Sequence, residues 1–186
     1  MRIIGGRFRG RRLTAPAGLK TRPMIARVRE ALYNILADRI VDARVADCFS
    51  GTGAVGLEAL SRGAASVDFF EAGRHAIGAL ERNIKALGLA GQSRVHRSEL
   101  PGVIGPGPSW DVVIVDPPWG RELGRPVAAK VVERGRIAPD GVIVVSERYG
   151  HEGDAAFWLE AGLTVIDRRR YGDSAMVITK ATAAPD

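Results

Sequence analysis

The stretch D-C-F-S-G-T-G-A-V-G, residues 47–56, decides the fold class of this 186-residue chain. A predicted strand precedes it and a predicted helix follows it. Gly51, Gly53 and Gly56 match the spacing G-x-G-x-x-G and stand where the strand turns into the helix. Glycines let the backbone approach a ligand closely, and the start of a helix offers free N–H groups. The stretch therefore predicts a nucleotide-binding strand–loop–helix unit.

Strand and helix patterns alternate on both sides of this stretch. This alternation predicts an α/β, Rossmann-like fold with a mostly parallel seven-stranded sheet and helices on both faces. We expect residues 1–40 to form a basic arm and a helix packed on the domain, residues 41–180 to form the domain, and residues 181–186 to fray. Gly5-Gly6 and residues 16–18 offer turns, so the arm is expected to be extended or a hairpin. The predicted strands are residues 45–49, 66–71, 94–97, 110–115, 141–146, 163–170 and 175–179, and the predicted helices are residues 25–40, 54–62, 74–87, 127–134 and 155–161.

Basic residues are concentrated at the start of the chain. Residues 1–29 contain nine Lys or Arg and no Asp or Glu, whereas the whole chain has a net charge of +6, so the remaining residues carry a net charge of −3. A basic arm on a slightly acidic domain is typical of a polyanion-binding protein. RNA or DNA binding is the expectation, and a solubilising tail is the alternative. The candidate phosphate-binding residues are Arg7, Arg9, Arg11, Arg12 and Arg22.

The composition is that of a single globular domain, with 46% apolar and 26% charged residues. No apolar run reaches the ~18 residues of a membrane span, and no secretory signal pattern is found at the start. Cys48 is the only cysteine, so we expect no internal disulfide and a cytoplasmic location. The three histidines lack metal-ligand spacing, so we expect no metal. A monomer is expected.

An acid in the right place narrows the choice of nucleotide. Glu71 stands twenty residues after Gly51, at the end of the next predicted strand, where a carboxylate can accept both hydroxyls of a ribose. This pattern fits NAD and S-adenosylmethionine equally well. Asp47 would repel a pyrophosphate but suits the cationic amino group of S-adenosylmethionine. Ser98 and Glu99 follow the third strand, where they either meet an adenine amine or form an exposed polar turn.

The stretch W-D-V-V-I-V-D-P-P-W, residues 110–119, predicts which residues bind the group that is modified. Ligands of open parallel sheets bind beyond the carboxyl ends of the strands, and Asp116 stands at such an end. A carboxylate and a backbone carbonyl there can hold both hydrogens of an aromatic amine and favour the charge that builds on its nitrogen. Pro117 and Pro118 would stiffen this loop, and Trp119 offers a face on which a flipped base can stack. The alternative is a capping acid followed by a core tryptophan.

D-P-P-W matches the [D/N/S]-P-P-[Y/F/W] motif of amino-group methyltransferases, and three further stretches extend the likeness. These are R-I-I-G-G-R-F-R-G-R-R-L, T-R-P followed by R-V-R-E-A-L-Y-N-I-L, and D-C-F-S-G-T-G-A-V-G-L-E-A-L-S-R-G-A. With them the chain resembles the RsmD family over residues 2–180. The resemblance implies a class I methyltransferase that moves a methyl group from S-adenosylmethionine to the N2 amine of a guanine in 16S rRNA, free or in the assembling 30S subunit.

The resemblance also implies roles for individual residues. Asp116, Pro117 and Trp119 would hold the guanine, and the arginines of the arm would hold rRNA. The residues that would surround the cofactor are Asp47, Ser50, Gly51, Gly53, Glu71, Ala72, Ser98, Glu99 and Leu100.

This chain departs from the family pattern at Met24 and Ala26, where polar residues are usual, and at Gly73, where a polar or acidic residue is common. Any hydrogen bonds that the family's polar side chains make at these three positions would be absent in this chain. Two rival functions stay open: an adenine-N6 DNA methyltransferase, for which the chain lacks a target-recognition region, and a non-catalytic RNA assembly factor that binds S-adenosylmethionine.

Overall fold

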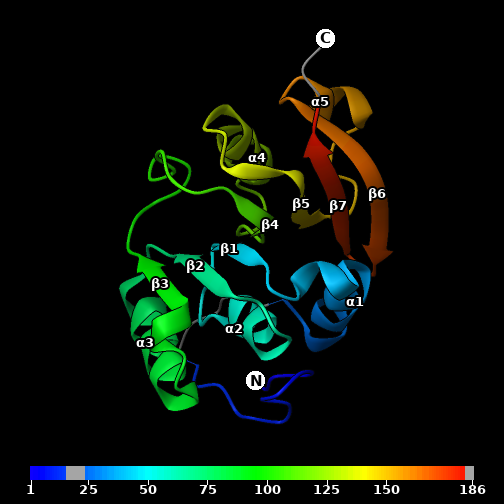
Figure 1. The fold of residues 1–186 in the computed structure, drawn as a ribbon. Helices are drawn as coiled ribbons and strands as arrows, with labels where there is room; N and C mark the ends of the chain where they lie inside the picture. Colours follow the sequence, from blue (N-terminus) through cyan, green and yellow to red (C-terminus); the bar gives the residue numbers. More distant parts are fainter. Residues whose placement is uncertain (16–23, 183–186) are drawn as a thin grey trace. The chain divides into compact units, whose positions relative to one another are not determined.

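The computed structural model describes residues 1–15 and 24–182, which form two compact units, Met1–Leu100 and the chain from Pro101 on. Within the described residues seven strands follow the order β3-β2-β1-β4-β5-β7-β6 (Figure 1). The predicted seven-stranded, mostly parallel sheet is confirmed. The strands are β1 (Arg44–Cys48), β2 (Ser66–Phe70), β3 (Ser93–His96), β4 (Trp110–Val115), β5 (Ile137–Arg148), β6 (Leu163–Tyr171) and β7 (Ser174–Ala181), and the helices are α1 (Ala26–Leu36), η1 (Ala37–Ile40), α2 (Ala54–Ser61), α3 (Arg74–Leu87), η2 (Ala90–Gln92), α4 (Gly124–Glu133) and α5 (Ala155–Leu159).

The first unit is a parallel three-stranded layer with helices packed on it. β1 pairs with β2, and β2 pairs with β3, all in parallel register. Helix α2 lies so close to β2 that a Cβ placed on Gly56 would come within 2.4 Å of the Phe69 ring. The third glycine of the motif therefore serves close helix-to-strand packing, because any side chain there would collide with β2.

Most limits in this unit lie within one residue of the prediction, and two of the differences have a cause in the backbone conformation. The helix expected over residues 25–40 ends as an α-helix at Leu36 and continues as the short 3₁₀ helix η1, because Ala37 has φ 40°. The first strand ends at Cys48 and not at Phe49, whose φ of 64° lies in the left-handed region. Both residues are non-glycines in a conformation that sequence patterns do not anticipate.

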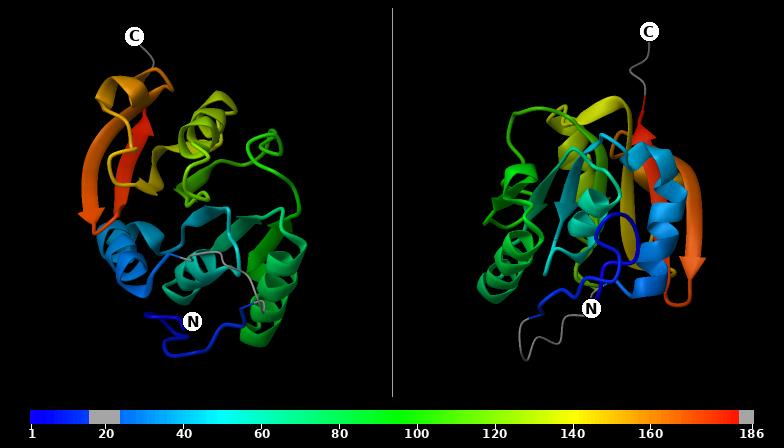
Figure 2. Two further views of the ribbon diagram at one scale, coloured as in Figure 1. Left: turned by 180° about the vertical axis from the view of Figure 1, so that it is seen from behind. Right: turned by 60° about the horizontal axis from the view of Figure 1, so that its bottom comes forward.

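The predicted arm is a hairpin, as the glycines suggested. Arg2 and Arg12 form an antiparallel bridge, and the amide of Ile3 donates to the carbonyl of Arg11 at 3.0 Å. Ile3 and Leu13 are buried, which anchors both branches. Figure 2 shows the arm beside α2 and α3. The turn expected at residues 16–18 lies outside the described residues.

In the second unit β5 pairs with β4 in parallel and with β7 antiparallel, and β6 is antiparallel to β7. Helix α4 begins at Gly124, three residues earlier than predicted, because Pro126 fits in the first helical turn, where its missing N–H costs nothing. β5 begins at Ile137 and not at residue 141, across an irregular pairing with β4. In the part of the chain that the structure describes, no helix has the length and apolar character needed to cross a membrane.

Candidate active site

The glycine loop of the first unit is tied to the strands around it. Gly51 (φ 56°) and Gly53 (φ 81°) both adopt the left-handed conformation. Asp47 is buried, and its Oδ2 accepts a hydrogen bond from the amide of Gly56 at 2.8 Å. The Ser50 hydroxyl lies 2.7 Å from the carbonyl oxygen of Asp47 and so has no base as its partner. The loop that sequence reasoning identified is therefore held in one shape by the acid and the hydroxyl predicted to lie at the cofactor.

Glu71 lies directly after β2 and connects two glycine amides. Its Oε2 accepts from the amide of Gly51 at 2.8 Å, and its Oε1 accepts from the amide of Gly73 at 2.7 Å. A Cβ on Gly73 would lie only 2.9 Å from Oε1, so the departure from the family pattern gives this carboxylate room. A carboxylate has about four acceptor positions. Two bonds to amides leave the others able to accept the two hydroxyls of a ribose.

The remaining predicted cofactor residues follow β2 and β3 at the same end of the strands. The amide of Glu71 donates to the carbonyl of His96, the last residue of β3, at 3.1 Å. This bond brings the segment after β3 next to the glutamate. Ala72, Ser98 and Glu99 are exposed there, and Leu100 is half-buried. Sequence reasoning missed His96, whose Nε2 lies 2.7 Å from Asp68 Oδ1 and whose ring stacks on Phe70.

The residues predicted to hold the methyl acceptor belong to the second unit. Asp116 follows β4, and burial raises the pKa of its carboxyl from 3.8 to about 6, partly offset by a hydrogen bond with the buried Ser146. Pro117 is buried, Pro118 is exposed and Trp119 is half-buried. The pair of Asp116 and Ser146 was not foreseen, because Ser146 lies on a different strand and its spacing gives no signal.

A second carboxylate near Asp116 also escaped the sequence reading. Burial raises the pKa of Glu147 to about 7; a hydrogen bond from the amide of Gly124 lowers it, and the charge of Asp116 raises it further. A Cβ on Gly124 would lie 2.4 Å from Glu147 Oε1, so this glycine makes space for the acid. Two carboxyls that are both protonated more readily than usual therefore lie at the end of β4 and β5.

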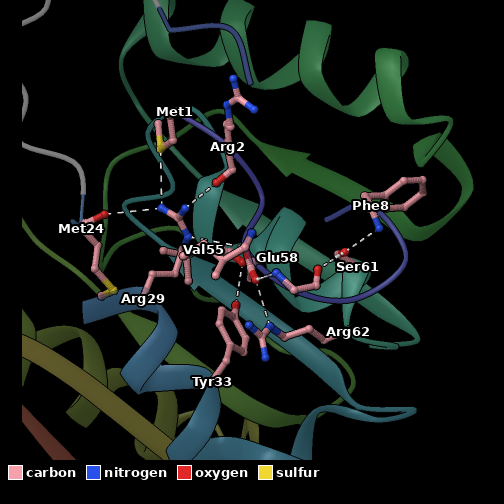
Figure 3. Close-up of polar contacts among 12 residues, drawn as sticks. Met1, Arg2, Phe8, Met24, Arg29, Tyr33, Val55, Glu58, Ser61 and Arg62 are labelled. Carbon is pink, nitrogen blue, oxygen red and sulfur yellow. Dashed lines mark hydrogen bonds and ion pairs between the residues drawn. The ribbon is translucent and has the colours of Figure 1, made fainter. Parts of the chain in front are cut away.

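The arm is fixed to α2 by a buried ion cluster (Figure 3). Glu58 accepts the amides of Ile4 and Gly5 at 2.8 and 2.7 Å. It also pairs with Arg62 at 2.9 Å and with Arg29 at 3.6 Å. Arg29 is almost fully buried, although charged residues on a helix are usually solvated. The start of the arm is therefore a docked part of the first unit, since its backbone donors are satisfied by a buried acid.

Further bonds extend this docking toward the glycine loop. The Ser61 hydroxyl donates to the carbonyl of Gly5 at 2.6 Å. Asn83 of α3 is buried; its Oδ1 accepts the amide of Thr14 at 2.8 Å, and its Nδ2 donates to the carbonyls of Thr14 at 3.1 Å and Thr52 at 3.0 Å. One side chain thus joins the arm to the residue between Gly51 and Gly53.

The arginines predicted to bind RNA are distributed over the exposed side of the arm. Arg7, Arg9, Arg11 and Arg12 are all exposed, and Arg22 lies outside the described residues. Arg7 donates to Gln92 at 2.8 Å, and Arg11 donates to the carbonyl of Ala86 at 3.2 Å. Among residues 1–15 and 24–182 no group of three or more His, Cys, Asp or Glu is placed to hold a metal ion.

Comparisons with known proteins agree with this geometry. The family model described as "Conserved hypothetical protein 95" matches residues 1–180. The Ribosomal RNA small subunit methyltransferase D of Escherichia coli (strain K12) is 42% identical over 146 residues, which are 78% of this chain and 73% of that protein. The solved structure of the E. coli protein yhhF superposes with a TM-score of 0.86 at 36% identity and covers 99% of both chains. A Precorrin-6y C5,15-methyltransferase from Geobacter metallireducens shares the fold with a TM-score of 0.69 at 16% identity, over 92% of this chain and 94% of that one.

Proposed function

Because the chain belongs to the family described as "Conserved hypothetical protein 95", the RsmD family, we propose that it transfers a methyl group from S-adenosylmethionine to the N2 amine of a guanine in 16S rRNA. The observation that carries the proposal is the acid at the end of β4. Asp116 is hydrogen-bonded to Ser146 and is followed at once by two prolines and a half-buried tryptophan. A turn that only closed a strand would need neither the half-buried acid nor the aromatic ring.

The residues of the first unit fit S-adenosylmethionine. The loop at Gly51 leaves open space where a side chain would stand, since a Cβ there would meet nothing within 4 Å. Glu71 would accept the ribose hydroxyls, and Asp47, Ser50 and Gly53 would surround the methionine part. Ala72, Ser98, Glu99 and Leu100 would line the adenine. When bound, the cofactor supplies a methyl group on a sulfonium and leaves as a neutral thioether.

The residues of the second unit prepare the amine. The nitrogen of an aromatic amine is a poor nucleophile, because its lone pair is delocalised into the ring. The Asp116 carboxylate and a backbone carbonyl of the loop would accept its two hydrogens, which favours the positive charge that builds on nitrogen. Pro117 and Pro118 stiffen this arrangement in advance, and Trp119 supplies the stacking face. After the N–C bond has formed, the ammonium gives up one proton, and the ionised Asp116 is a suitable acceptor.

The arm would bring the substrate. Its exposed arginines present planar guanidinium groups on a rigid hairpin, and guanidinium suits phosphate better than ammonium does. Because the arm is docked through Glu58 and Asn83, the chain loses little conformational entropy when it binds RNA. The rRNA is in this way bound by a surface that is already formed.

The experiment offers labelled S-adenosylmethionine with naked 16S rRNA, with 30S particles that lack the modification, and with duplex DNA. The labelled nucleoside is then identified by mass. We expect N2-methylguanosine in rRNA, and loss of the label in Asp116→Ala with cofactor binding retained. Label in DNA adenine would favour the rival enzyme. Bound cofactor without label in any substrate would favour the assembly factor.

A further inference from the structure

A second group of arginines lies at one end of the second unit. It comprises Arg148 and Tyr149 at the end of β5 and residues 168–171 at the end of β6, and we call it the arginine edge. All four of its arginines are exposed, and Tyr149 is 46% exposed. Residues 101–186 contain ten Lys or Arg against twelve Asp or Glu, so the cluster stands on an otherwise slightly acidic unit. Its positive charge is local and is not a property of the whole surface.

The strand register places the arginine edge beside the acceptor residues. Ser146, which bonds with Asp116, pairs with Met176 of β7, and Met176 pairs with Arg169 of β6. Adjacent strands lie ~4.8 Å apart, so the backbone of Arg169 is roughly 10 Å across the sheet from that of Ser146. Arg148 follows Ser146 by two residues on the same strand. The cluster is therefore within a few nucleotides' reach of Asp116, inside one unit.

The side chains of the arginine edge are arranged in advance. The Arg170 guanidinium lies 3.7 Å from the centre of the Tyr149 ring, and its Nε donates to the carbonyl of Gly172 at 3.1 Å. These contacts occupy one face and one donor, and among the described residues neither Nη atom of Arg170 has a hydrogen-bond partner. A fixed guanidinium loses little rotamer freedom when it binds phosphate.

The charge of the cluster suits a polyanion. Asp167 pairs with Arg169 at 2.9 Å, Asp173 lies in the adjoining turn, and Glu152 and Asp154 lie beside Arg168. Among the described residues Arg148, Arg168 and Arg170 form no ion pair with an acid, and the cluster also carries two tyrosines. Unpaired arginines combined with aromatic side chains are typical of surfaces that bind single-stranded nucleic acid. A surface for an acidic protein would not need the aromatic rings.

We propose that the arginine edge is a second RNA-binding surface, which holds the phosphates of the strand carrying the target base beside the acceptor loop. This proposal rests on the proposed function, because it assumes an RNA substrate. The arm then provides affinity for the rRNA as a whole, and the arginine edge positions the nucleotides next to the reacting base.

The test compares the triple variant Arg148→Gln/Arg169→Gln/Arg170→Gln with a control that removes the same charge elsewhere. The control variant is Arg82→Gln/Arg94→Gln/Arg134→Gln, three exposed arginines outside the cluster. Binding to 16S rRNA and to unmodified 30S particles is measured at several salt concentrations, together with methyl transfer, affinity for S-adenosylmethionine and thermal unfolding.

We expect the triple variant to lose about tenfold in RNA affinity near physiological salt. The slope of log affinity against log salt concentration should become shallower by about two, because each phosphate contact to a single strand contributes ~0.7 to that slope. Tyr149→Ala should weaken binding about fivefold or more through lost stacking. Cofactor affinity and unfolding temperature should stay at the wild-type values in every variant, and the control should bind RNA as the wild type does.

Unchanged RNA affinity and salt slope in the triple variant would overturn the proposal, as would an equal loss in the control. In both cases methyl transfer by the wild-type protein would leave the proposed function intact. If the wild-type protein bound no RNA and labelled none, the proposed function itself would fail, and the arginine edge would lose its partner with it.

Discussion

Asp116→Asn should make the protein more stable at neutral pH while it removes the acid that we propose for methyl transfer. Burial raises the pKa of Asp116 from 3.8 to about 6, so the folded protein holds this proton more tightly than the unfolded chain does. The stability that the protonated Asp116 contributes is therefore fully present at low pH and is lost as the pH rises from about 4 to about 6. Above that range the contribution of Asp116 to the free energy of unfolding no longer changes with pH. Asparagine keeps the size and one acceptor oxygen but has no charge to desolvate.

The magnitude follows from the rise of about two pKa units. One unit corresponds to about 1.4 kcal/mol, so the penalty for the ionised form approaches about 3 kcal/mol above pH 7 and is about 0.5 kcal/mol near pH 4. Partial exposure of the residue makes 3 kcal/mol an upper value. The stability advantage of the asparagine variant should therefore grow by about 2 kcal/mol between these pH values.

The assay is urea unfolding of both proteins in parallel from pH 4 to pH 8, with the difference between them plotted against pH. Every other titrating group is shared, but the charge of Asp116 raises the pKa of Glu147, so the difference reports Asp116 together with its coupling to Glu147. Ser146→Ala serves as a control: it removes a bond that lowers the pKa, so it should steepen the pH dependence and not flatten it. A difference in free energy of unfolding between the two proteins that was the same at every pH would refute the reasoning, because Asp116 would then ionise at no cost in stability.

Other changes test the remaining structural claims. Activity of the wild-type enzyme should rise with pH through about 6 as Asp116 ionises, which kcat/KM measured from pH 5 to pH 8 would show; a flat profile would exclude a role for its charge. Glu58→Gln should cost about 3–5 kcal/mol in urea unfolding, because Arg29 is left as a buried charge with a neutral neighbour. Asn83→Leu should weaken cofactor binding several-fold in calorimetry. Gln92→Leu should not, because it loses a contact with the arm and bonds to the carbonyls of Ala64 and Ala65 but none to the glycine loop.

The sequence alone was sufficient for the features that depend on periodicity and on local chemistry. The limits of α3 and β4 were predicted to the residue, because amphipathic and apolar runs there end at clear breakers. The three glycines lie where a strand turns into a helix, as predicted, and at Gly56 close packing between a helix and a strand leaves no room for a side chain. The extension of β5 back to Ile137 was missed, since Pro139 and Gly141 read as a turn and only pairing across the sheet makes a strand of them.

The geometry of the candidate site was predictable where it depends on spacing along the chain and not where it depends on contacts between distant segments. Glu71 could be found by counting from Gly51, because the length of a βαβ unit is nearly fixed. Ser146 and Asn83 could not, since each acts on a group more than thirty residues away or on another element, and nothing in a local window marks them. A buried Arg29 was equally invisible, because its counter-charge comes from a different helix.

One short helix of the first unit joins the loop proposed to bind the cofactor to the arm proposed to bind RNA. Helix α2 begins at Ala54, directly after the glycine loop that Asp47 fixes through the amide of Gly56, and it ends at Ser61, which bonds to the arm. Between them, Glu58 satisfies two amides of the arm and neutralises a buried arginine. An eight-residue helix does not stretch, so a shift of the loop at one end must move the docking groups at the other. A cofactor that shifts the loop should therefore change the affinity of the arm for RNA, and by reciprocity RNA held on the arm should change the affinity for the cofactor by the same factor.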